Sequence, residues 1–230
     1  MRPSLSILAA MLAACAASHA AELTDTERRW LQGIAPVMSA ARSEKLPLDI
    51  VVQPQTTPGA APLAMAFVDG RCKLVFSMRG NPQARETLER IDPALFDATL
   101  ELMAAHELGH CRRHLGGAWY TVPAGFTAGA APRGATARAS ETDSRAERRE
   151  EGFADLMGLA WTRQHHPALY AALHAWLVTE RSTDRVPGSP HDTLAWLRLA
   201  IDGAALDGPP QPGVAALWRR GLADSDSADD

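Results

Sequence analysis

The stretch MAAHELGHCRRH, residues 103–114, constrains this chain more than any other segment of similar length. It contains three of the chain's eight histidines together with Glu107. On a helix, His106 and His110 lie one turn apart on the same face, so both imidazoles can reach one ion. Glu107 points to one side of that line, where a carboxylate can take a proton without binding the ion. The pattern, H-E-x-x-H, is typical of a catalytic zinc site on a helix.

A helix that carries this pattern is predicted from residue 93 to about residue 114. Asp92 followed by Pro93 favours a helix start, and Gly116-Gly117 favours its end. We interpret His114 as a solvent-facing or capping residue, because a further turn of a straight helix carries its side chain away from the ion. The alternative for the whole stretch is a solvated polar face. The metal hypothesis therefore requires a third ligand elsewhere in the chain.

The third ligand is expected in the segment EEGFAD. Glu151 lies 41 residues after His110, and Asp155 follows four residues later on the same helical face. Glu151 would bind the ion, while Asp155 would accept a hydrogen bond from the far nitrogen of a ligand histidine. The alternative interpretation is an acidic helix start favoured by the helix dipole, which accounts for Glu147 and Glu150.

The combined pattern resembles the gluzincins, and specifically the M48-like metallopeptidases, in which HExxH and ExxxD helices carry these roles. The flanking sequences AAHELGHCRRH and GFADLMGL are also similar to that family, and the resemblance extends over about residues 48–200. It implies one Zn²⁺ per chain, Glu107 as general base and Asp155 as the group that orients His106. The matching residues are His106, Glu107, His110, Glu151 and Asp155.

The sequence departs from the family pattern downstream of the ligand helix. Members commonly carry His-Pro and then an arginine, whereas this chain has Ser189-Pro190-His191-Asp192, with Arg198 seven residues after the histidine. One interpretation makes His191 a catalytic group that stabilises the oxyanion of the tetrahedral intermediate. The rival interpretation makes residues 189–192 a helix-opening cap.

The implied fold class is α+β, a mainly helical zincin-type domain with a small β-sheet packed beside the HExxH helix. A chain of 230 residues, 46% of them hydrophobic, can bury the core of one such domain. We assign the domain to residues 24–220, followed by an acidic disordered tail at 221–230.

Periodicity and turn signals predict the elements of this domain. A helix is expected over residues 24–42, capped by Thr24 or Asp25, and helices are also expected over 145–164, 167–181 and 191–202. Strands are expected in LDIVVQP, PLAMAFV and RCKLVFSM, with a hairpin turn at Asp69-Gly70. The segment at about residues 119–144 is rich in Ala, Gly, Thr, Pro and Arg, which favours either a mobile loop or lid, or plain disorder.

Residues 1–20 have the layout of a secretory signal peptide, with a basic start, a short apolar run and then small residues. Two processing outcomes remain open. Cleavage after Ala20 would release a soluble protein, while Leu12-Ala13-Ala14-Cys15 is similar to a lipobox, in which lipidated Cys15 would tether the chain to the membrane. Both outcomes predict an exported protein of the bacterial periplasm.

Cysteine usage agrees with export. Either cleavage leaves Cys72 and Cys111 as the only pair that can form an intramolecular disulfide, which an oxidising compartment favours. The alternative is that both are small buried hydrophobic residues.

The function expected from these features is that of a zinc metalloendopeptidase acting on exported polypeptides. The net charge is -4, whereas proteins that bind nucleic acid usually carry an excess of basic residues, so nucleic acid is not an expected partner. The strand RCKLVFSM is a candidate for binding an extended substrate by edge pairing. The alternative function is a non-catalytic, metal-binding periplasmic or lipid-anchored factor that acts by binding a partner.

Overall fold

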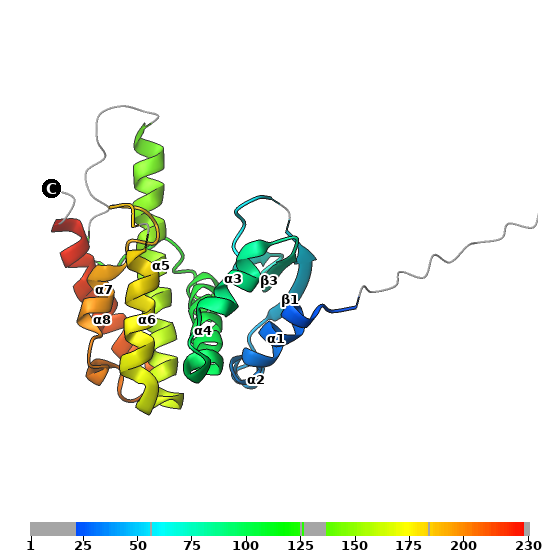
Figure 1. The fold of residues 1–230 in the computed structure, drawn as a ribbon. Coiled ribbons are helices and arrows are strands. Elements are labelled where there is room, and N and C mark those ends of the chain that lie inside the picture. Colours follow the sequence, from blue (N-terminus) through cyan, green and yellow to red (C-terminus); the bar gives the residue numbers. More distant parts are fainter. Residues whose placement is uncertain (1–21, 56, 125, 127–136, 184, 228–230) are drawn as a thin grey trace, which may run out of the picture.

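The computed structural model describes residues 22–55, 57–124, 126, 137–183 and 185–227. The expected signal peptide and Cys15 lie outside the described residues. Within the described part, the chain is an α+β fold with many helices and one three-stranded sheet (Figure 1). None of the described helices combines the length and apolar character that crossing a bilayer requires.

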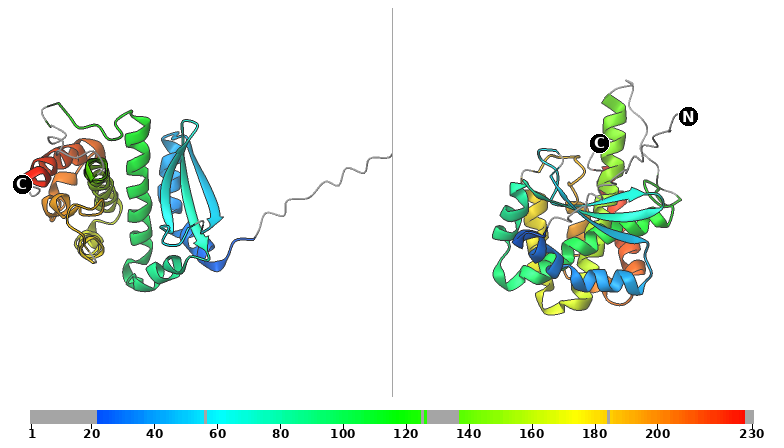
Figure 2. Two further views of the ribbon diagram at one scale, coloured as in Figure 1. Left: turned by 90° about the horizontal axis from the view of Figure 1, so that it is seen from above. Right: turned by 90° about the vertical axis from the view of Figure 1, so that its right-hand side faces the viewer.

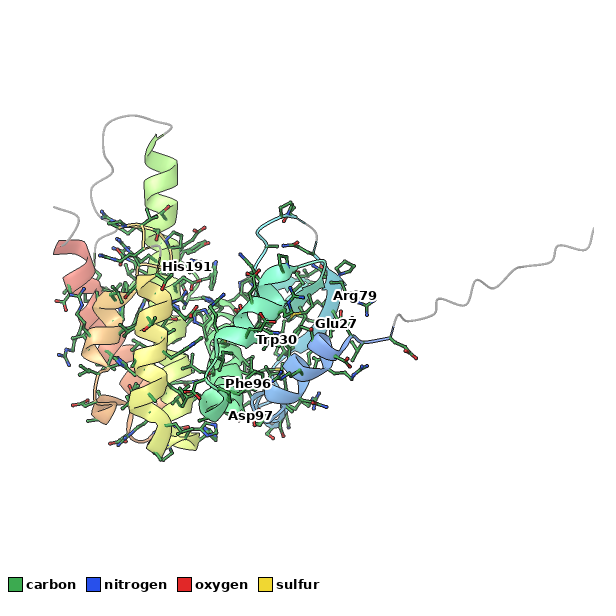
Figure 3. The ribbon with its side chains drawn as sticks, viewed as in Figure 1. Glu27, Trp30, Arg79, Phe96, Asp97 and His191 are labelled. Carbon is green, nitrogen blue, oxygen red and sulfur yellow. A yellow bond between two sulfur atoms is a disulfide. The ribbon has the colours of Figure 1, made fainter. Side chains whose placement is uncertain are left out.

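The first predicted helix is in fact two helices, α1 (Asp25–Gly33) and α2 (Ala35–Ser43). Thr24 caps α1 and forms a capping box with Glu27. Of the two predicted caps, Thr24 and Asp25, Thr24 is therefore confirmed. The chain breaks between the helices because Pro36 has no N–H to donate to the preceding turn. Glu27 is also buried against Arg79 of the sheet, with a guanidinium nitrogen 2.9 Å from its carboxylate (Figure 3).

The sheet contains β1 (Leu48–Pro54), β2 (Leu63–Val68) and β3 (Arg71–Arg79) in the order β1-β3-β2. β2 and β3 form the predicted hairpin, and the left-handed φ angles of Asp69 and Gly70, 52° and 72°, make its tight turn. β1 pairs with β3 in parallel. The expectation that RCKLVFSM offers a free edge is wrong, because β3 has a partner strand on each side.

Helix α4 (Phe96–Leu115) carries the HExxH pattern and lies in the middle of the molecule. It follows α3 (Pro82–Arg90), which lies outside the predicted elements, and a short 3₁₀ turn at Pro93–Leu95. The sheet and α1 and α2 lie on one side of α4, and the helices from α5 onwards lie on the other (Figure 2). The small sheet beside the HExxH helix is therefore confirmed.

The second half of the chain is helical. It contains α5 (Ala137–His165), a 3₁₀ turn (Pro167–Leu169), α6 (Tyr170–Ser182), α7 (Leu194–Leu199), a 3₁₀ turn (Ala204–Leu206) and α8 (Pro210–Ser227). Two buried clusters divide the core accordingly. One joins α1, α2 and the sheet to one side of α4, and the other joins α5 to α8 and the other side of α4.

Several boundaries differ from the prediction. The helix expected over residues 191–202 is shorter and covers only Leu194–Leu199. The loop expected over about residues 119–144 ends earlier, because α5 already begins at Ala137, where alanine, arginine and glutamate favour helix. The tail expected to be disordered over residues 221–230 is helical as far as Ser227. Leu222 explains this difference, since its side chain is fully buried in the second core cluster.

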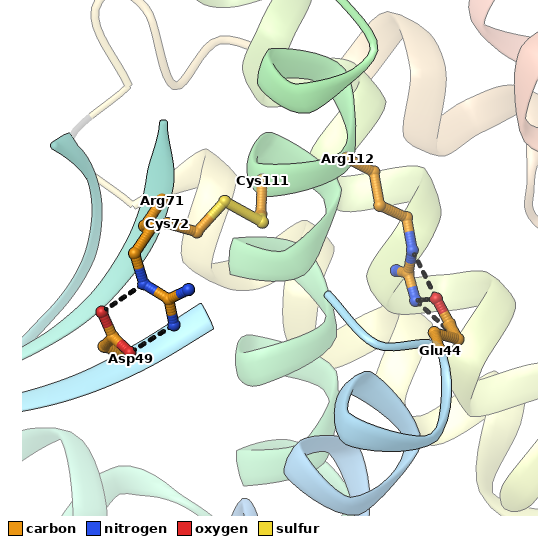
Figure 4. The surroundings of a disulfide bond; sticks show 6 residues. All are labelled: Glu44, Asp49, Arg71, Cys72, Cys111 and Arg112. Atoms are coloured by element: carbon orange, nitrogen blue, oxygen red, sulfur yellow. Dashed lines mark hydrogen bonds and ion pairs between the residues drawn. A yellow bond between two sulfur atoms is a disulfide. The ribbon is translucent and has the colours of Figure 1, made fainter. Parts of the chain in front are cut away.

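Cys72 and Cys111 form the predicted disulfide, with a Cα–Cα distance of 5.7 Å (Figure 4). The bond joins β3 to the last turns of α4, and both residues are fully buried. Salt bridges flank it on each side, between Arg71 and Asp49 and between Arg112 and Glu44. The helix that carries the two predicted histidine ligands is thus covalently fixed to the sheet.

Candidate metal centre

The three predicted ligands come together at one point between α4 and α5. The Nε2 atoms of His106 and His110 are 3.1 Å apart. Glu151 presents Oε2 at 3.4 Å from His106 Nε2 and Oε1 at 3.3 Å from His110 Nε2. One ligand atom from each residue lies within 4.8 Å of the others, so these residues could hold one metal ion.

A close approach of the two helices makes this convergence possible. Gly109 lies between the two histidines, and a Cβ placed there would come within 3.0 Å of the Ala154 Cα and 3.1 Å of the Met157 Cβ on α5. Gly158 makes a similar contact with α4, since its Cβ would lie 2.9 Å from the carbonyl oxygen of Leu102. Small residues at these positions let the backbone of α5 come near enough for Glu151 to reach both imidazoles.

Asp155 lies behind His106 and is completely buried. Nδ1 of His106 donates to Oδ1 of Asp155 at 2.9 Å, which leaves the Nε2 lone pair of the histidine directed at the ligand cluster. Thr193 donates its hydroxyl to the other carboxylate oxygen at 2.5 Å. The contact expected between Asp155 and a ligand histidine is therefore present, and the histidine is His106.

Arg181 is a site residue that the sequence did not reveal. Its Nε and Nη2 donate to the two oxygens of Asp155 at 2.9 and 2.7 Å, and Nη2 also lies 3.3 Å from Oε2 of Glu151. Arg198, the arginine that follows His191 by seven residues, is exposed and does not line the cleft. Arg181 ends a predicted helix, but no local spacing relates it to EEGFAD, so only the packing of α6 on α5 identifies it.

The charges of the site favour a cation at the point of convergence. Burial opposes ionisation of Glu151, but hydrogen bonds from His106 and His110 outweigh it and hold the pKa of Glu151 well below its ordinary value. Burial also opposes protonation of His106, yet its hydrogen bonds to Asp155 and Glu151 raise its pKa to about 10. The two carboxylates thus attract a positive charge to the imidazoles, either a proton or a metal ion.

His110 differs from His106 in its surroundings. Its Nδ1 is buried and has no hydrogen-bond partner among the described residues, whereas Nδ1 of His106 is held by Asp155. The ring of His110 instead meets Trp119 edge to face, with centroids 5.6 Å apart. The orientation of His110 therefore depends on packing and on what its Nε2 binds.

Glu107 lines the same cleft as the three ligands but is not part of the ligand cluster. Desolvation at the cleft wall raises the pKa of its carboxyl above the ordinary value, and this effect exceeds the opposing attraction of His106 and His110. A carboxyl group with a raised pKa beside a cation site can exchange a proton with a bound molecule.

The cleft has a volume of about 470 Å³ and lies at the seam between the two halves of the molecule. Its walls are mainly apolar side chains of β2, α4 and α6, and the ligands and Glu107 lie between them. They include Leu63, Met65, Leu102, Met103, Trp176 and Leu177.

His191 also lines this cleft, on the loop that precedes α7 (Figure 3). Its Nε2 is 3.9 Å from Oε2 of Glu151, and its side chain is 70% exposed. The neighbouring Asp192 pairs with Arg185 and accepts from the backbone N–H of Gly188, so it fixes the loop. His191 therefore stands at the mouth of the site, free of strong contacts with the ligands.

His114 and Glu150 have structural contacts that the sequence did not predict. The ring of His114 stacks on Phe67, with centroids 3.8 Å apart, and does not join the ligand cluster. Glu150 is buried and forms a salt bridge with Arg113 at 2.6 Å. The interpretation of Glu150 as part of an acidic helix start is wrong, because α5 begins thirteen residues earlier, at Ala137.

The chain matches no protein-family model, no curated protein and no solved structure.

Proposed function

We propose that this protein is a zinc-dependent endopeptidase of the M48-like gluzincin type that cleaves exported polypeptides. The observation that carries the proposal is the convergence of two imidazoles and one carboxylate at the wall of a cleft, with Glu107 beside them but outside the ligand cluster. Three protein ligands are the number that a catalytic zinc site requires, because the fourth position must be free for water or substrate.

The distances between the ligand atoms support zinc. Ligand atoms about 2.0 to 2.1 Å from a tetrahedral ion lie about 3.3 Å from one another. The two imidazole Nε2 atoms are 3.1 Å apart, and each lies near a different oxygen of Glu151, Oε2 at 3.4 Å from His106 and Oε1 at 3.3 Å from His110. When bound, zinc would lower the pKa of a water molecule and polarise the peptide carbonyl.

In the proposed mechanism, Glu107 accepts a proton from the attacking water and passes it to the leaving amine. Its raised pKa suits both steps, since a base with a pKa nearer to neutral can release the proton that it has taken. Asp155 keeps His106 in the tautomer that presents Nε2, and Arg181 keeps Asp155 ionised. In this proposal His191, at the mouth of the cleft, donates a hydrogen bond to the oxyanion.

The cleft suits an extended polypeptide. Among the described strands β2 pairs with β3 alone, and residues 61–65, which lead into β2, line the cleft beside His106 and Glu107. A substrate strand that paired with this edge would lie along the site, with alternate side chains directed at the apolar walls. The edge strand proposed for substrate is therefore β2.

Export to the periplasm, either as a soluble protein or tethered through a lipidated Cys15, belongs to the same proposal. The buried Cys72–Cys111 disulfide agrees with an oxidising compartment. In the periplasm this disulfide would stay oxidised.

The test compares wild type with Glu107→Gln, measuring metal content by mass spectrometry and hydrolysis of casein. We expect about one equivalent of zinc in both proteins, because the ligands are unchanged. Hydrolysis should be sensitive to chelators in wild type and at least roughly 100-fold slower in the variant, because general-base catalysis contributes at least that factor.

The same experiment distinguishes the second candidate. A protein that bound zinc but hydrolysed nothing would be a metal-binding interaction factor, a function favoured by the exposed position of His191. Equal casein hydrolysis by wild type and Glu107→Gln would instead refute the assigned role of Glu107.

A further inference from the structure

A short turn after α4 brings two aromatic residues to the cleft. The N–H of Thr121 donates to the carbonyl oxygen of Ala118 at 3.0 Å, which closes the turn over residues 118–121. Trp119 and Tyr120, its central residues, both line the cleft that contains the ligand cluster. The Tyr120 residue is 51% exposed, so its ring stands at the rim.

A buried ion pair from the two ligand helices holds this turn. Arg113 of α4 donates to both carboxylate oxygens of Glu150 of α5, at 2.8 and 2.6 Å. Each partner also bonds to the turn, since Arg113 donates to the carbonyl oxygen of Thr121 and Glu150 accepts from the N–H of Tyr120, both at 2.9 Å. The position of the turn is therefore fixed relative to the helices that carry His110 and Glu151.

The backbone of Tyr120 is strained. Its φ angle is +61°, in the left-handed region that side chains with a Cβ rarely adopt. Only two other described residues besides glycine have positive φ, Lys45 and Asp69, and neither lines the cleft. Strain of this kind persists where surrounding contacts impose it, and it occurs often at binding sites.

The ring of Trp119 is held by its neighbours. It meets Phe67 and Tyr120 with centroids 5.1 Å apart in each case, and it meets His110 at 5.6 Å. A ring that is already fixed loses little conformational freedom when it binds a ligand. Trp119 and Tyr120 thus form a rigid, partly exposed aromatic surface beside the ligand cluster.

We propose that the turn at residues 118–121 is a specificity site, in which Trp119 and Tyr120 bind a large apolar side chain of the polypeptide substrate. This inference rests on the proposed function and adds to it a substrate class, polypeptides with an aromatic or long aliphatic residue near the cleaved bond. The strained backbone at Tyr120 agrees with this role, since strain of this kind occurs often at binding sites.

The test measures binding instead of turnover. Zinc-loaded Glu107→Gln protein is titrated by calorimetry with two capped peptides, hexa-alanine and the same peptide with phenylalanine at its third position. Burial of the phenyl ring should make the second peptide bind roughly tenfold more tightly. Adding Tyr120→Gly should reduce this preference to roughly twofold without lowering the melting temperature, because glycine adopts a positive φ freely.

Two variants serve as controls. Tyr120→Phe keeps the ring and should keep the preference, and Lys45→Gly, which relieves the same kind of strain far from the cleft, should keep it too. If Tyr120→Gly does not fold, Tyr120→Asn replaces it, since asparagine tolerates the left-handed region. The inference is overturned if the glycine or asparagine variant retains the tenfold preference, or if the Glu107→Gln protein has none. The proposed function is tested separately, by casein hydrolysis with the wild type. A wild type that does not hydrolyse casein would refute the proposed function, but it would not by itself decide whether the turn binds an apolar side chain.

Discussion

The two halves of this molecule are stabilised in different ways. The half that contains the sheet and α1 to α4 has a covalent bond between β3 and α4, placed one residue after His110. The half that contains α5 to α8 has no disulfide among its described residues, and its site residues are held by buried charges. Asp155 there accepts hydrogen bonds from Arg181 and Thr193.

The difference indicates how the site is assembled. The sheet half contributes His106, His110 and Glu107, and the helical half contributes Glu151, Asp155 and Arg181. Neither half contains three ligands, so a metal ion would join them at the seam between α4 and α5. The disulfide fixes the helix that carries the histidines, while hydrogen bonds from Arg181, Thr193 and His106 position Asp155.

The largest effect is expected from Glu151→Ala, which removes the one candidate metal ligand that the described residues of the helical half contribute to the cluster. Two imidazoles alone should not retain the ion, and the bound zinc should fall to near zero after dialysis. Asp155→Ala should have a smaller effect, a loss of affinity of roughly 10- to 100-fold. Glu147→Ala is the matched control, since it lies on the same helix and lines the same cleft without contributing a ligand atom. Unchanged zinc binding in Glu151→Ala would mean that the third ligand is another residue.

Removing the disulfide tests how far this bond stabilises the half that contains the sheet. The cysteines are 39 residues apart, and in the chain-entropy treatment a loop of this length contributes roughly 4 kcal/mol to the free energy of unfolding. The double variant Cys72→Ser/Cys111→Ser should lose about this amount in urea denaturation, and it should bind zinc more weakly because the end of α4 is released. Thiol titration of unreduced, denatured wild type should find no free thiol from this pair. Two free thiols would rule out the bond in the exported protein.

Arg181→Gln tests how far the buried ion pair between Arg181 and Asp155 stabilises the helical half. The change leaves Asp155 buried with fewer donors, and breaking such a pair costs about 3 kcal/mol or slightly more. Zinc affinity should fall as well, because Asp155 orients His106. Arg198→Gln, at an exposed arginine, should change the free energy of unfolding by less than about 0.5 kcal/mol. Similar values for the two variants would show that Arg181 does not stabilise the site.

The smallest effect is expected at the seam itself, from Gly109→Ala. The added methyl group would press on Ala154 and Met157, and overpacking of this kind costs about 1 to 3 kcal/mol. Alanine is favoured over glycine in a helix by about 1 kcal/mol, so the net loss should be roughly 1 kcal/mol. Zinc affinity should decrease at the same time. A variant that is more stable and binds zinc as tightly would show that the helices do not need this close approach.

Sequence alone determined the parts of the site that depend on local geometry. A helix has a fixed number of residues per turn, so the spacing of His106 and His110, and of Glu151 and Asp155, was enough to place each pair on one face. Capping by Thr24 and the hairpin at Asp69-Gly70 were predictable for the same reason, because each depends on neighbouring residues.

Only the tertiary structure decided which distant residues meet. Arg181 reaches the cleft through the packing of α6 on α5, and the turn with Trp119 and Tyr120 reaches it through the Arg113–Glu150 pair. No local pattern encodes either approach. The position of β3 in the centre of the sheet, which leaves β2 as the strand beside the cleft, also depends on pairing between distant segments. Contacts of this kind result from packing the whole core, and their residues therefore have no spacing in the sequence by which they can be recognised.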